Sequence, residues 1–144
     1  MNANQAPRSQ RDVFRLILAM LTVSLGVYIL MTYLAEPSLP VRQPMPSLQL
    51  FTTILTLVAF AGVIIGLAVE AAMQRAATSP GGVRAAGIVS AALGEAPALY
   101  GLVIFFVSGH RNWFFFGLSI VYFIGMWLRL PGMLRRMDEL FPKS

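Results

Sequence analysis

Residues 94–106 read GEAPALYGLVIFF, an apolar run that contains one carboxylate and one proline. The run belongs to a longer apolar segment, at about residues 85–109, which is long enough to cross a bilayer as a helix. Glu95 lies ten residues after Ala85, about 15 Å along that helix, so it is expected near the bilayer centre. A charged side chain at that depth costs about 2.5–3.5 kcal/mol on insertion scales, which makes Glu95 a candidate functional residue.

The composition indicates an integral membrane protein. Of 144 residues, 57% are hydrophobic and only 12% are charged, which excludes an ordinary soluble domain. The chain has no cysteine, so disulfides and thiolate metal sites are excluded. The net charge of +5 does not indicate a nucleic-acid partner, because the basic residues lie at the ends of apolar segments rather than in one patch.

The hydropathy pattern predicts an all-α bundle of four transmembrane helices. Residues 1–12 are polar and are interpreted as a cytoplasmic tail. Pro131-Gly132 is expected to end the last helix, leaving residues 131–144 as a basic, amphipathic cytoplasmic tail that forms an interfacial helix or serves only as a topology signal. The predicted spans are about residues 13–35, 48–73, 85–109 and 113–130.

Lysine and arginine positions predict that both termini are cytoplasmic. This orientation places nine basic residues inside and only Arg42 and Arg111 outside, as the positive-inside rule requires. We therefore expect a location in the inner (plasma) membrane of a bacterium. The nine inner residues are Arg8, Arg11, Arg15, Arg75, Arg84, Arg129, Arg135, Arg136 and Lys143.

The connections are predicted from proline and glycine. Between Glu36 and Ser47 lie Pro37, Pro40, Pro44 and Pro46, which predict an extended loop, with a proline-rich recognition motif as the alternative. A turn is expected over residues 74–84, which contain the sequence TSPGG.

Small residues predict close packing of the second and third spans. Gly62 and Gly66 form a Gly-x-x-x-Gly pair, which allows another helix to approach closely. The third span carries small residues at spacings of 4, 3, 4 and 3, so we expect a tight antiparallel hairpin. These helix-packing candidates are Gly87, Ala91, Gly94, Ala98 and Gly101.

The setting of Glu95 favours proton chemistry. Desolvation disfavours the charged form, so the carboxyl is expected to be protonated much of the time. Pro97 cannot donate to the carbonyl of Leu93, which leaves an acceptor within a turn of Glu95. Residues 61–65 offer no amide or carboxylate to share a cation, so a proton is favoured over sodium. A purely structural role, with Glu95 as a packing contact, remains the alternative.

Other titratable residues predict no further chemistry. Glu70 is expected to form an ion pair with Arg75 or Arg84 at the cytoplasmic end of its span. The single histidine, His110, has no second ligand candidate nearby. Since the sequence shows no catalytic constellation, phosphate-binding loop or metal motif, we expect neither an enzyme nor a bound metal or cofactor.

The sequence EAPALYGLVI, residues 95–104, resembles the ion-carrying helix of the proteolipid, subunit c, of rotary ATP synthases. The glycine-rich second span is similar to that family's first helix, and the resemblance covers about residues 50–108. It implies that Glu95 carries an ion, with Gly62 and Gly66 at packing positions. The first and fourth spans have no counterpart, and Thr78-Ser79-Pro80 stands where the family usually has Arg-Gln-Pro. The resemblance therefore implies a subunit-c-like hairpin within a protein of another function.

Two hypotheses follow. In the first, the protein binds or translocates protons through Glu95, as a homo-oligomer or with other membrane subunits. In the second, it is a non-catalytic accessory or assembly subunit of a larger membrane complex, in which Glu95 only packs.

Overall fold

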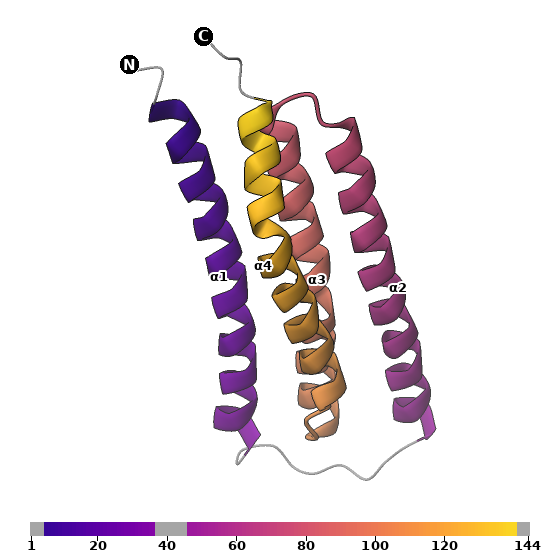
Figure 1. Cartoon of the computed structure of the whole chain (residues 1–144). Helices are drawn as coiled ribbons and strands as arrows, with labels where there is room; N and C mark the ends of the chain where they lie inside the picture. Colours follow the sequence, from indigo (N-terminus) through magenta and orange to yellow (C-terminus); the bar gives the residue numbers. More distant parts are fainter. Residues whose placement is uncertain (1–4, 37–45, 141–144) are drawn as a thin grey trace.

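The computed structural model describes residues 5–36 and 46–140, with the side chains of residues 5–10 left aside. Its helices are α1 (Gln5–Ala35), α2 (Pro46–Ala76), α3 (Pro80–Ser108) and α4 (Trp113–Glu139), and the described residues contain no strand. Figure 1 shows α1 and α2 on opposite sides of the bundle, with α3 and α4 between them.

All four helices are long and apolar enough to cross a membrane, over Arg11–Ala35 in α1 and along the whole of the other helices. The prediction of an all-helical chain with four membrane-spanning helices is therefore confirmed by length and composition. The chain is a small all-α membrane protein.

Helices α3 and α4 form the centre of the packing, because each of them contacts the three other helices, whereas the described parts of α1 and α2 do not touch. The glycines of α3 lie against aromatic rings of other helices. A Cβ at Gly87 would overlap Phe14 of α1, one at Gly94 would overlap Tyr122 of α4, and one at Gly101 would lie 2.9 Å from Cβ of Phe115 on α4. Ala91 and Ala98 between them are also buried.

The partner of this small-residue face differs from the expected one. We predicted packing against α2, but Gly87, Gly94 and Gly101 accommodate α1 and α4. On α2, a Cβ at Gly66 would lie 3.1 Å from the Tyr122 hydroxyl and 3.2 Å from Cβ of Leu93 on α3, so Gly66 does pack against α3, whereas one at Gly62 would meet nothing within 4 Å. Gly62 faces open space at its Cβ position and lines a pocket between α2 and α3.

The turn between α2 and α3 is shorter than predicted, since only residues 77–79 separate the helices. Ser79 caps α3: its Oγ accepts a hydrogen bond from the Gly82 N–H at 3.3 Å, and Pro80 occupies the first helical position. A serine cap followed by proline is a strong helix start, which explains why residues 80–84 are helical and not part of the turn.

The predicted helix end at Pro131-Gly132 is wrong, because α4 continues to Glu139. Met133, Leu134 and Met137 are buried in the main core, so packing outweighs the lost backbone hydrogen bond. Residues 131–139 are thus the last turns of a bundle helix and not a separate interfacial helix.

The other end of the chain is also more helical than expected. α1 begins at Gln5, so most of the predicted polar tail is helical, and Arg11 of α1 forms an ion pair with Asp138 of α4. The predicted proline-rich loop lies largely outside the described residues, as do Arg42, Lys143 and residues 1–4.

Candidate functional site

Glu95 lies near the middle of α3, on the side that faces α1. The Ser24 hydroxyl contacts Oε1 of Glu95, and the Tyr28 hydroxyl donates to the same oxygen at 2.8 Å. Ser24 and Tyr28 are four residues apart in α1 and therefore share one helix face. The candidate site is thus one carboxyl, held between two helices by two hydroxyl groups.

The hydrogen bonds around Glu95 are compatible with both the protonated and the ionised carboxyl. Ser24 Oγ also lies 2.7 Å from the Leu21 carbonyl oxygen, but a hydroxyl has only one hydrogen to donate. When the carboxyl is protonated, it can donate to Ser24, which then donates to Leu21, while Tyr28 donates to Glu95. When the carboxyl is ionised, Ser24 and Tyr28 can both donate to it, so both protonation states find hydrogen-bond partners.

The site contains no positive charge among the described residues, since no lysine, arginine or histidine there forms an ion pair with Glu95. Its nearest polar partners are neutral hydroxyls. The Glu95 carboxyl is thus held by neutral donors alone among the described residues.

Glu70 has the opposite environment. Its side chain is buried and accepts hydrogen bonds from Gln74 Nε2 at 3.0 Å, from Ser90 Oγ at 2.5 Å and from Arg129 Nη1 at 3.0 Å. Tyr122 extends the network, with its hydroxyl 2.5 Å from Ser90 Oγ. We call these residues the Glu70 cluster; because they come from α2, α3 and α4, the cluster joins three helices.

The predicted ion pair of Glu70 therefore exists, but its partner differs. The sequence suggested Arg75 or Arg84, which are close along the chain, whereas the structure pairs Glu70 with Arg129 of α4. With a cation and two further donors, Glu70 is suited to a structural role that links the helices. It does not resemble Glu95 in chemistry.

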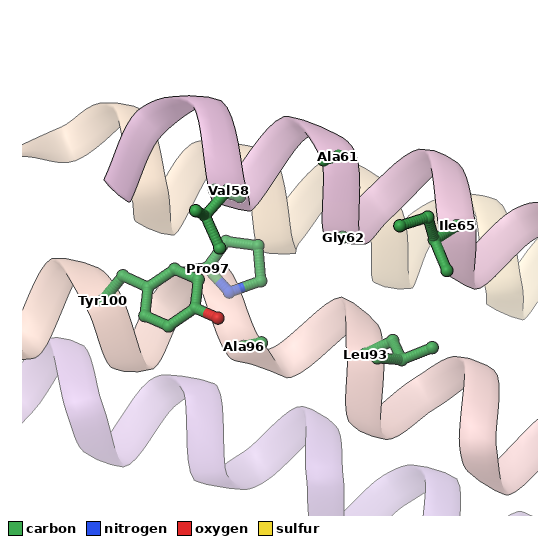
Figure 2. A pocket seen from close by; sticks show the side chains of 9 residues that line it. Val58, Ala61, Gly62, Ile65, Leu93, Ala96, Pro97 and Tyr100 are labelled. Carbon is green, nitrogen blue, oxygen red and sulfur yellow. The ribbon is translucent and has the colours of Figure 1, made fainter. Parts of the chain in front are cut away.

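The Leu93 carbonyl, which Pro97 leaves without its helical donor, is not the hydrogen-bond partner of Glu95 in the structure. Glu95 bonds to Ser24 and Tyr28 of α1 instead. α3 continues through Pro97, and the N–H of the next residue, Ala98, donates to Ser119 Oγ of α4 at 3.0 Å. Pro97 instead lines an apolar pocket of about 220 Å³ between α2 and α3. Figure 2 shows Pro97 and Tyr100 of α3 in this pocket, near Val58 of α2, with Gly62 further along.

His110 lies between the end of α3 and the start of α4, in a hollow that Arg111 and Trp113 also line. The Arg111 guanidinium forms an ion pair with Glu36, and its central carbon lies 3.9 Å from the centre of the Tyr33 ring. Within the described residues, no group of three or more His, Asp or Glu side chains could hold a metal ion.

Sequence reasoning identified Glu95 but missed the hydroxyls that hold it. A signal was present: Ser24, Tyr28 and Thr32 recur every four residues in an otherwise apolar span. In the structure Thr32 is fully buried and bonds the carbonyl of Ile29 in its own helix, so only two of the three reach Glu95.

Comparison of the chain with protein-family models, with curated proteins and with solved structures finds no match.

Proposed function

We propose that this membrane protein binds and releases a proton at the Glu95 carboxyl. The observation that carries the proposal is the pair of hydroxyl contacts from Ser24 and Tyr28, in a site without a cation among the described residues. A carboxyl within a membrane-spanning helix is rare, and such residues commonly belong to proton or ion pathways. Because both protonation states find hydrogen-bond partners, the proton can leave without stranding a polar group.

The small number of oxygen atoms at the site favours a proton over a metal cation. Besides the carboxyl itself, only two hydroxyl oxygens contact Glu95 among the described residues. No second carboxylate or amide joins them there, and hard cations prefer more oxygen ligands than this. The resemblance of residues 95–104 to the ion-carrying helix of subunit c points in the same direction.

Labelling with a hydrophobic carbodiimide tests the proposal, since this reagent adds to protonated carboxyl groups in membranes. We expect modification at Glu95, identified by peptide mass spectrometry, with less modification as the pH rises. Glu70 is an internal reference in the same chain, and its ion pair with Arg129 should leave it unmodified. Absence of labelling at Glu95 at every pH would refute the proposal.

Proton movement is measured separately, with the purified protein in vesicles that contain a pH-sensitive dye. If Glu95 carries protons across the membrane, Glu95→Gln abolishes any flux, because the amide cannot release a proton in this pH range. Tyr100→Phe is a matched control, since Tyr100 does not bond Glu95 in the structure. Full flux in Glu95→Gln would show that this carboxyl is not the carrier.

A second candidate function, assembly with other membrane helices, is favoured by Gly62. Apart from its neighbours in α2, no atom of the described residues lies within 4 Å of a Cβ placed there, and Gly62 borders the pocket shown in Figure 2. A glycine left open on a membrane helix can admit a second copy or another subunit. Gly62→Leu should then reduce the mass of the purified particle, whereas Gly26→Leu on α1, where a Cβ also meets nothing within 4 Å, should not.

A further inference from the structure

A hollow of about 300 Å³ lies between the last turns of α2 and the second half of α4. It lies toward the end of the bundle where α1 begins and α4 ends, an end that Figure 1 shows at the top. We call it the α2–α4 hollow. Its walls combine polar and apolar side chains. They are Glu70, Gln74, Leu128, Arg129, Gly132 and Met133.

Arg129 retains donor capacity toward the hollow. Its Nη1 bonds Glu70 and its Nε donates to the Gly125 carbonyl at 3.1 Å, while none of the hydrogen bonds among the described residues uses Nη2. The side chain is 40% exposed, whereas that of Glu70 is 4% exposed and accepts three hydrogen bonds. The group available to a ligand is therefore the guanidinium and not the carboxylate.

The rest of the hollow suits a molecule with an apolar part. Leu128 is 77% exposed and lies beside Arg129 in the chain, so an apolar surface adjoins the free guanidinium edge. Gly132 leaves space, since a Cβ there would meet nothing within 4 Å. A guanidinium next to apolar surface at the end of membrane helices matches the junction of a lipid headgroup and its acyl chains.

We propose that the α2–α4 hollow binds an anionic phospholipid, with the phosphate against Arg129 and an acyl chain along Leu128. The surrounding charge supports an anionic ligand, because Arg75 and Arg135 are exposed near the same end. A soluble phosphate compound would gain nothing from the exposed leucine, so the lipid is the favoured source of the phosphate. This site is separate from Glu95 and does not depend on the proton-binding proposal.

The test is native mass spectrometry of the purified full-length protein, titrated with phosphatidylglycerol in detergent micelles. Gly132→Leu is the key variant, because it fills the hollow and leaves the residues of the Glu70 cluster unchanged. Gly117→Leu is the matched control: a Cβ there also meets nothing within 4 Å, but Gly117 does not line the hollow. Arg129→Gln removes the charge directly.

We expect Arg129→Gln to weaken phosphatidylglycerol binding by about fivefold, the effect of one basic residue near an anionic membrane surface. Gly132→Leu should also weaken it, because the hollow is filled, and Gly117→Leu should leave it unchanged. Phosphatidylcholine should bind wild type more weakly, and glycerol phosphate should not compete. Equal lipid binding by wild type and Gly132→Leu would overturn the proposal. An equal loss in Gly117→Leu, or competition by glycerol phosphate, would overturn it as well.

Discussion

The Tyr28 hydroxyl of α1 donates to Oε1 of Glu95 on α3 at 2.8 Å, although 67 positions separate the two residues in the chain. Together with Ser24, Tyr28 makes α1 one wall of the carboxyl's environment. The first span is therefore part of the candidate site, and not an addition beside a self-sufficient hairpin of α2 and α3.

Replacing Tyr28 with phenylalanine should make Glu95 more reactive. The change removes one of the two hydroxyls that contact Oε1 of Glu95, so the carboxyl loses a hydrogen-bond partner and becomes more accessible to the reagent. A hydrogen bond is worth about 1 kcal/mol, which corresponds to about fivefold faster carbodiimide labelling. Labelling is followed over time by peptide mass spectrometry, with Tyr100→Phe as the control. Unchanged labelling in Tyr28→Phe would mean that this hydroxyl does not affect the carboxyl.

Replacing Glu70 with glutamine should destabilise the bundle. The amide removes the partner of Arg129 and disturbs a network that joins α2, α3 and α4. Since Arg129 is partly exposed, we expect a loss of about 1–3 kcal/mol, less than for a fully buried pair. The measurement is the thermal unfolding midpoint in detergent. Glu139→Gln, at the exposed end of α4, should leave the midpoint unchanged, and equal midpoints for both variants would contradict a stabilising role of the cluster.

Gly94→Ala should be poorly tolerated, because the new methyl group would overlap the Tyr122 ring. Overpacking of a helix contact costs about 1–3 kcal/mol, which exceeds the gain of about 0.5–1 kcal/mol from replacing a helical glycine. Gly117→Ala has open space and should be neutral or slightly stabilising. Urea or thermal unfolding of the two variants distinguishes them, and a stabilised Gly94→Ala would show that α3 and α4 are less closely packed than described.

Met137→Ala tests whether α4 extends beyond Pro131. Met137 is fully buried, so its truncation should cost about 2–5 kcal/mol if the last turns pack in the bundle. Leu128→Ala, at a residue that is 77% exposed, should have little effect on the same unfolding midpoint. A small effect of Met137→Ala would support the interfacial tail that the sequence alone suggested.

The number of helices was predictable, because long apolar runs separated by prolines and glycines leave few alternatives. The positions of the helix ends were less predictable. Ser79 and Pro80 looked like part of a turn but cap and start α3. Pro131 looked like a helix end, yet tertiary burial of Met133 and Met137 keeps α4 intact. The composition around Pro131 does not reveal this burial, because Met133 and Met137 are buried in a core cluster that includes residues of α1 and α3.

The candidate site was predictable only in part. Glu95 stands out because a carboxylate is rare in an apolar span, but Ser24 and Tyr28 are ordinary residues whose role depends on α1 lying against α3. Arg129 was missed as the partner of Glu70 for the same reason, since the pair joins α2 to α4. Contacts between helices that are far apart in the sequence can be predicted only when the packing of the helices is known. The spacing of the small residues did not predict where α1 and α4 pack.

The placement of Ser24 and Tyr28 on one helix and of Glu95 on another has a thermodynamic consequence. If the proton changes the strength of these contacts, then proton occupancy and the docking of α1 share one coupling free energy, which acts equally in both directions. A ligand, lipid or partner that loosened α1 would change the proton affinity of the carboxyl, and a change in pH would alter how firmly α1 is held.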